Sequence, residues 1–150
     1  MKTIETTTNY IEWLSAEEMH KQSQAWLSEL NFIKDEHLFF EDLIKTFTIE
    51  LLELNDFSND KEIVDAINRS EKQNMQFIEA VVVHEKGLEI MVDQIDQPKY
   101  EKIYKQAHKK LAIQINQFLQ EYRMLKSQVF TIITAVKKEA KYRALLDRKY

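Results

Sequence analysis

Residues that break helices and form tight turns are almost absent from this chain: its 150 residues include one glycine, Gly87, and one proline, Pro98. Globular proteins usually contain about 7% glycine and about 5% proline. Sheet proteins need such residues at their turns, and phosphate-binding loops, dinucleotide fingerprints and nucleophile elbows need glycine where the backbone turns tightly. The composition therefore argues against these classes and predicts an all-α protein.

The chain contains no cysteine. This excludes a disulfide framework, a zinc–thiolate site, an iron–sulfur cluster and a thiol nucleophile. No stretch of the sequence is apolar over 18 residues, so we expect no transmembrane segment. The first residues lack the apolar region of a secretory signal, which predicts a cytoplasmic protein.

Three helix starts and one clear break divide the chain. Ser15 and Glu18 have the spacing of a capping box, and Leu14 and Met19 the spacing of a hydrophobic staple. A competing start at Asn9 leaves residues 1–14 as an N-terminal segment without an assigned structure.

The next group of turn-forming residues is 55–60, where Asn59 and Glu62 offer a second cap. The third helix is expected to begin at Pro98, since proline suits a first helical turn.

Core-facing positions recur at alternating steps of four and three residues in each stretch, which is typical of helices packed at shallow angles. They are Met19, Ser23, Trp26, Leu30, Ile33, His37, Phe40, Ile44, Phe47, Leu51 and Leu54; Ile63, Ile67, Ser70, Asn74, Phe77, Val81, His84, Leu88, Met91 and Ile95; and Tyr104, His108, Leu111, Ile115, Phe118, Tyr122, Leu125, Val129, Ile132 and Val136. We predict a single domain over residues 1–150, an up-down-up bundle of three long antiparallel helices near 16–54, 60–95 and 98–146 with coiled-coil-like packing. A four-helix bundle, with the third helix split, is the alternative.

Further apolar residues lie beside these core-facing positions. Some would widen the core, and the remainder would be exposed on a monomer, which usually marks an interface. We therefore predict a homo-oligomer. The residues concerned are Leu38, Phe39, Ile49, Leu52, Ile78, Val82, Phe130 and Ile133.

Charge is divided unevenly along the chain. Residues 1–60 hold 13 acidic and 4 basic residues, whereas residues 99–150 hold 4 acidic and 13 basic residues. In an up-down-up bundle the first and third helices are adjacent and parallel, so we expect these charges to pair and to set the register. Only four of the 21 basic residues are arginine, which argues against a nucleic-acid partner.

Residues 137–150 are predicted to form a basic helical overhang beyond the bundle. A basic amphipathic end without an intramolecular partner is a candidate docking element for a protein partner; a frayed terminus is the alternative. The candidate partner-binding residues are Lys137, Lys138, Lys141, Arg143 and Arg148.

Histidines on core-facing positions are the candidate metal ligands. Turns centred near residues 57 and 97 place His84 within one turn of His108 and level with Leu30. These two histidines, with Glu29 or Glu85, could form a mononuclear site for iron or zinc. A buried polar layer that sets the helix register is the alternative.

His37 is placed level with Phe77, about two turns from this layer. With Glu41 it resembles the His-x-x-x-Glu element of hemerythrin-type di-iron proteins, but the second histidine pair of such a centre is missing. His20 forms the one Glu-x-x-His motif, with Glu17, where ferritin-like sites use two; we interpret it as solvated surface.

The stretch Trp26-Leu27-Ser28-Glu29-Leu30, followed by Phe32 and Lys34-Asp35-Glu36, resembles an uncharacterised family of small helical proteins from flavobacteria and related Bacteroidetes. This resemblance implies an intracellular helical bundle and implies no activity or site.

No serine has a motif for nucleophilic activation, and the paired carboxylates at 35–36 and 41–42 are expected on wet surface, where pKa values are not shifted for acid–base work. We therefore expect a non-enzymatic helical bundle, without a cofactor, that acts by self-association and protein docking. A metal-binding bundle that uses the core histidines is the alternative.

Overall fold

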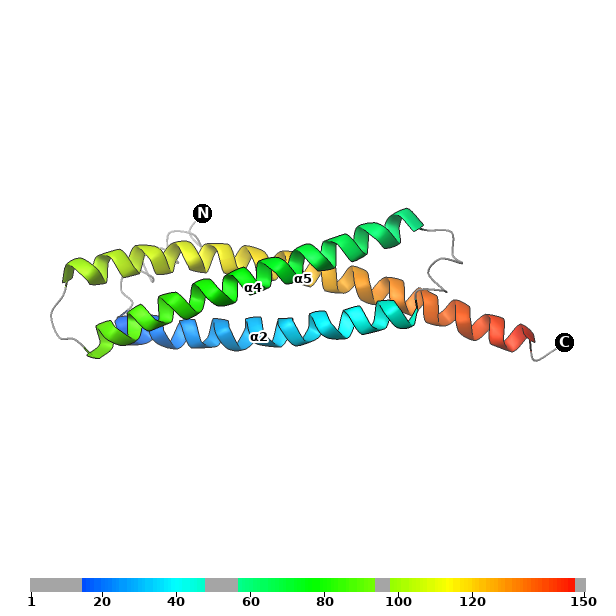
Figure 1. Cartoon of the computed structure of the whole chain (residues 1–150), viewed down its shortest axis with the longest axis horizontal. Helices are drawn as coiled ribbons and strands as arrows, with labels where there is room; N and C mark the ends of the chain where they lie inside the picture. Colours follow the sequence, from blue (N-terminus) through cyan, green and yellow to red (C-terminus); the bar gives the residue numbers. More distant parts are fainter. Residues whose placement is uncertain (1–14, 48–56, 94–97, 148–150) are drawn as a thin grey trace, which may run out of the picture. The chain divides into compact units, whose positions relative to one another are not determined.

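A computed structural model of the chain describes residues 15–47, 57–93 and 98–147, with the side chains of 57–60, 91–93 and 98–100 left out. It contains helix α2 (Ala16–Thr46), helix α4 (Phe57–Asp93) and helix α5 (Pro98–Asp147) (Figure 1). These residues include no strand, and the three helices pack against each other. The predicted all-α, three-helix bundle is confirmed.

The start of α2 follows the predicted cap. The Glu18 backbone N–H donates a hydrogen bond to Ser15 Oγ at 3.1 Å, and the Met19 N–H donates to the Ser15 carbonyl at 3.0 Å. Glu17 and Glu18 also place negative charge in the first turn, where the helix dipole favours it. Leu14, the predicted staple partner, and the competing start at Asn9 lie outside the described residues.

The predicted end of the first helix, residue 54, is wrong, because α2 ends at Thr46. The Thr46 hydroxyl donates to the Asp42 carbonyl at 2.8 Å, and the Phe47 N–H donates to the Leu43 carbonyl at 3.0 Å. A threonine that bonds back to the preceding turn weakens a helix. The remainder of that prediction, residues 48–54, lies outside the described residues.

The observed starts of α4 and α5 agree only in part with the starts predicted from the sequence. Helix α4 begins at Phe57, so a cap at Asn59 is wrong, since that residue lies inside the first turn. Helix α5 begins at Pro98 as predicted and continues for 50 residues. The four-helix alternative, which required a break in this helix, is wrong for the same reason.

The structure divides into two compact units, and each contains a segment of every helix. Unit 1 comprises the residues up to Phe32 together with Asn74–Leu119, and unit 2 comprises Ile33–Gln73 together with the residues from Gln120 onward. Each unit is described by itself below. The prediction of a single domain over residues 1–150 stays a prediction.

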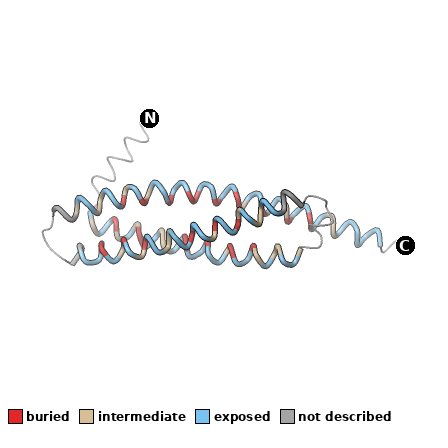
Figure 2. The backbone as a smooth tube through the Cα atoms, turned by 45° about the horizontal axis from the view of Figure 1, so that its top comes forward, coloured by how far each residue is buried: buried red, intermediate tan, exposed pale blue. Residues whose placement is uncertain are grey.

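The predicted core-facing positions are buried or half-buried wherever the structure describes them (Figure 2). Polar residues at these positions are buried as well as apolar ones. They are Ser23, His37, Ser70 and Asn74. Of the apolar residues expected beside them, Ile133 is buried, while the exposed ones are Leu38, Phe39 and Phe130. Ile49 and Leu52 lie outside the described residues.

Contacts within the units show the helix directions. In unit 1, Asn74 Nδ2 of α4 donates to the Leu30 carbonyl of α2 at 2.9 Å, and His20 of α2 lies near Glu85 of α4. Later residues of one helix thus meet earlier residues of the other, as antiparallel helices require. In unit 2, α2 and α5 run parallel, because Glu36 meets Tyr122 and the later Phe40 meets the later Phe130.

The predicted register between the first two helices is wrong. In unit 2, His37 meets Ser70 at 2.9 Å, whereas a turn centred near residue 57 placed it level with Phe77. His37 thus meets an α4 residue about two helical turns earlier than predicted, in the direction expected when α2 ends at Thr46 and not at residue 54. None of the helical segments that the structure describes is long and apolar enough to cross a membrane.

Candidate functional site

A buried pair of histidines joins α4 and α5 in unit 1. His84 Nε2 lies 3.0 Å from His108 Nδ1, which confirms that the second turn brings these residues to one level. His108 Nε2 lies 2.6 Å from Gln22 Oε1 of α2. The three side chains therefore form one hydrogen-bonded chain across all three helices of the unit.

The Gln22 amide oxygen fixes where the protons of the three hydrogen-bonded side chains lie, because this oxygen can only accept a hydrogen bond. His108 donates to it from Nε2, and its Nδ1 is then an acceptor when the ring is neutral. His84 must donate from Nε2 to that nitrogen. Each of the facing nitrogens has a partner, as a buried polar group requires.

Burial keeps both rings neutral near pH 7. Loss of hydration lowers the pKa of His84, and the same cause, with a smaller contribution from the neighbouring His84, lowers the pKa of His108 to about 4. Trp26 stacks on His108 with ring centres 4.6 Å apart and planes 24° apart. The Tyr104 ring packs on the His84 ring, with ring centres 5.9 Å apart.

The predicted metal site at His84 and His108 would require a change in the hydrogen bonding of the pair. The His84 and His108 ring centres lie 5.2 Å apart, about as far as two rings joined end to end through a hydrogen bond. A metal held between the two facing nitrogens would have to displace that hydrogen bond, whereas His108 could keep its bond from Nε2 to Gln22. Of the expected further ligands, Glu29 is exposed and Glu85 faces His20. Metal binding at this pair stays a prediction.

His37 forms a second buried polar layer, in unit 2. Its Nε2 bonds to the Ser70 hydroxyl at 2.9 Å, and its ring meets Tyr122 edge-on at 5.3 Å. Burial lowers the pKa of His37, although the charges of Glu36 and Glu41 oppose this. A hemerythrin-like role for His37 and Glu41 stays a prediction.

Glu36 links α2 to α5 in unit 2. It accepts a hydrogen bond from the Tyr122 hydroxyl at 2.9 Å, and its other oxygen lies 2.6 Å from Lys126 Nζ. Burial, followed by this hydrogen bond to Glu36, raises the pKa of Tyr122 above its ordinary value. This is the kind of pairing between an acidic first helix and a basic last helix that the charge distribution predicts.

The carboxyl groups of Glu41 and Glu71 also meet in unit 2. A hydrogen bond to Glu41, with burial and the Glu41 charge, raises the pKa of Glu71. The sequence placed Glu41 on wet surface, yet it is only half-exposed.

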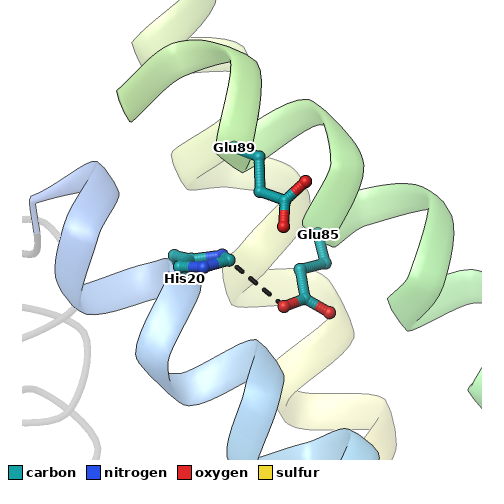
Figure 3. Close-up of side chains that lie close together, drawn as sticks. All are labelled: His20, Glu85 and Glu89. Atoms are coloured by element: carbon teal, nitrogen blue, oxygen red, sulfur yellow. Dashed lines mark ion pairs between the residues drawn. The ribbon is translucent and has the colours of Figure 1, made fainter. Parts of the chain in front are cut away.

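His20 is the site residue that sequence reasoning missed. The sequence paired it with Glu17, but Glu17 lies 3.9 Å from Lys21 on the same helix. His20 instead faces α4 in unit 1, where its Nδ1 lies 3.6 Å from Glu85 Oε1, and Glu89 lies beside them (Figure 3). The only sequence signal for this cluster is the i,i+4 spacing of the two glutamates; the register that brings His20 to them is not visible in the sequence.

The predicted partner-binding residues lie on the last turns of α5, in unit 2. Lys137 Nζ lies 5.9 Å from the centre of the Phe47 ring, while Lys138 and Lys141 are exposed. Arg143 Nε lies 3.4 Å from Glu139 one turn earlier. Arg148 lies outside the described residues. The overhang predicted from residue 137 thus begins with a lysine that lies over the ring of Phe47, the residue that follows α2.

No protein-family model, curated protein or solved structure matches this chain. The resemblance to small flavobacterial helical proteins stays a prediction.

Proposed function

We propose that this chain is a non-enzymatic helical-bundle protein that acts by self-association and by docking to protein partners. The observation that carries the proposal is the exposed apolar stripe at the end of α5. Tyr142, Leu145 and Leu146 are 60%, 52% and 41% exposed. Their spacing of i, i+3 and i+4 places them on one face of the helix.

A second exposed apolar patch in unit 2 supports the same proposal. Phe39 of α2 and Phe130 of α5 both pack against the buried ring of Phe40, with ring centres 6.2 and 5.6 Å from it. Both remain partly exposed, at 52% and 41%. Apolar side chains gathered around one point of the surface are typical of interfaces.

Charge favours a second copy of the chain as the partner. Phe130 lies on the same face of α5 as Arg123 and Lys138, while Lys126 beside them is already paired with Glu36 of the same chain. The acidic residues of the chain are concentrated in residues 1–60. The basic end of one copy can therefore meet the acidic half of another, which favours association and orients it. We also propose coiled-coil-like packing of the helices. It is supported by the buried positions, which recur along each helix at alternating steps of four and three residues. No residue is assigned a catalytic role.

The test is the mass in solution of the full chain and of two charge variants, measured by light scattering over a range of concentrations. Leu145→Glu places a charge in the apolar stripe. Ala144→Glu places the same charge on the opposite face of the same turn, where the residue is also exposed. We expect a multiple of 18.0 kDa for the wild type and Ala144→Glu, and a shift toward the monomer for Leu145→Glu.

A wild-type protein that stays monomeric at every concentration would contradict the proposal. So would equal association of the wild type and the Leu145→Glu variant, because the stripe would then lie outside the interface.

A further inference from the structure

Three potential metal ligands converge between α2 and α4 in unit 1. His20 comes from α2, and Glu85 and Glu89 come from one face of α4, one helical turn apart (Figure 3). Each offers one ligand atom, and these atoms all lie within 4.8 Å of one another. The cluster is distinct from the His84–His108 pair and uses none of its atoms.

His20 has an unmet bonding requirement. Its Nδ1 is buried and has no hydrogen-bond partner, although the His20 side chain as a whole is 21% exposed. The nearest carboxylate oxygen, of Glu85, lies 3.6 Å away, which is too far for a hydrogen bond. A buried polar atom without a partner is costly, and a bound cation would remove that cost.

We propose that His20, Glu85 and Glu89 bind one divalent transition-metal ion of the zinc class. An imidazole nitrogen with two carboxylate oxygens suits such an ion, whereas calcium and magnesium prefer sites made of oxygen alone. Two carboxylates and a neutral imidazole carry two negative charges, which the ion balances. No shared residue links this inference to the proposed self-association.

The distances allow binding without movement of the helices. Zinc–nitrogen and zinc–oxygen bonds are about 2.0–2.2 Å long, so two ligand atoms of a tetrahedral site lie about 3.3–3.6 Å apart. The present limit of 4.8 Å thus needs to close by at most about 1.5 Å. Rotation of the glutamate side chains supplies this, since Glu89 is exposed. Three protein ligands leave a position for water, and the exposed Glu89 provides the entry path.

An ion pair between a protonated His20 and Glu85 is the competing explanation. It accounts for the 3.6 Å contact, but it assigns no role to Glu89. The two explanations therefore differ in what a change at Glu89 does to metal affinity.

The experiment titrates zinc into the full chain, freed of metal with a chelator, by calorimetry. Glu89→Gln removes one ligand at an exposed position, so the fold is kept. Glu79→Gln is the matched control, an exposed glutamate of α4 outside the cluster. Loss of an outer contact alone costs a metal site about 10–100-fold in affinity. We therefore expect one zinc ion per chain, with affinity lowered at least about tenfold in Glu89→Gln and unchanged in Glu79→Gln.

Thermal unfolding gives a second measurement, because zinc bound only to the folded chain raises the Tm. We expect this rise in the wild type and in Glu79→Gln and its loss in Glu89→Gln and His20→Gln. Absence of zinc binding, or binding that Glu89→Gln leaves unchanged, would overturn the proposal. Zinc binding that is lost in His84→Gln but kept in Glu89→Gln would also overturn it and would place the metal at the histidine pair instead.

Discussion

The ring of Tyr104 occupies the space beside Gly87 in which a β-carbon would lie. Gly87 is buried inside α4, and Tyr104 of α5 also packs against the Met19 and Leu88 core. A glycine inside a helix costs about 1 kcal/mol relative to alanine, so its presence there calls for a reason. The close approach of Tyr104 gives a physical reason for it: no larger residue fits unless the ring moves.

We expect Gly87→Ala to destabilise the protein, because displacing the Tyr104 ring costs about 1–3 kcal/mol, more than the gain of about 1 kcal/mol in helix propensity. In a Tyr104→Leu background the same substitution should stabilise, since the space beside residue 87 is then available. Urea unfolding of the four proteins gives the comparison. Equal effects of Gly87→Ala in both backgrounds would contradict the role of the ring.

Stability should fall with acid because buried histidines have lowered pKa values. Burial lowers the pKa of His37 and His84, and lowers that of His108 to about 4, from 6.5. Below pH 6.5 the unfolded chain therefore binds protons that the folded chain does not. Above that pH the histidines are neutral in both the folded and the unfolded chain, so they do not make the free energy of unfolding depend on pH.

The free energy of unfolding should decrease from pH 6.5 toward pH 4, by at most about 1.4 kcal/mol per pH unit for each histidine. Urea unfolding at several pH values measures this slope, and His108→Gln should make it shallower. Identical slopes for the wild type and His108→Gln would show that His108 does not titrate as its burial requires.

The His37–Ser70 pair should show the cost of a buried polar group left without its partner. Ser70→Ala removes the hydroxyl that meets His37 Nε2 and should lower the free energy of unfolding by about 1–3 kcal/mol. Replacing both partners, as His37→Leu with Ser70→Ala, should cost less than Ser70→Ala alone, because no polar group is then stranded. The midpoints of urea unfolding test this order, and the reverse order would contradict it.

Tyr122 should ionise late in an alkaline titration. Burial and its hydrogen bond to Glu36 raise its pKa, so stability present below about pH 10 should be lost as the pH rises further. In an ultraviolet titration of the six tyrosines, one phenolate should form only as the protein unfolds. Tyr122→Phe should remove this late phase, and Glu36→Gln should move it to lower pH. A late phase that survives Tyr122→Phe would belong to another tyrosine.

Glu71→Gln should stabilise the protein at pH 7. The pKa of Glu71 is raised by its hydrogen bond to Glu41, by burial and by the Glu41 charge. The stability that goes with its protonated form is therefore lost as the pH rises through that pKa. The substituted amide keeps a hydrogen-bond donor for Glu41 without the charge. The gain in the urea midpoint should shrink at pH 4, and exposed Glu79→Gln should show no such gain.

Much of the fold was predictable because helix periodicity is a local property. The steps of four and three identified the buried face of each helix, including polar members such as Ser70 and Asn74 that hydropathy alone would place outside. The pairing of His84 with His108 was also predictable. Pro98 marks the start of α5 in the sequence, and this places the second turn correctly.

The pairing of α2 with α4 was decided only by the tertiary structure. His37 meets Ser70 instead of Phe77, so α4 is shifted by seven residues relative to the prediction. Ser70 and Phe77 are both core-facing positions, so a shift of this size replaces one core-facing residue by another. Registers that differ by a heptad bury nearly the same apolar stripe, so periodicity cannot choose among them. Specific polar contacts can, such as the bond from Asn74 to the Leu30 carbonyl.

The same shift brings His20 to Glu85 and Glu89 and Gln22 to His108. The sequence by itself thus determined the three long helices, apart from the end of α2 and the start of α4, and the faces that they bury, because both depend on neighbours along the chain. The tertiary structure alone decided which polar side chains meet across the helices, because that depends on where α2 ends and on how the buried polar groups find partners.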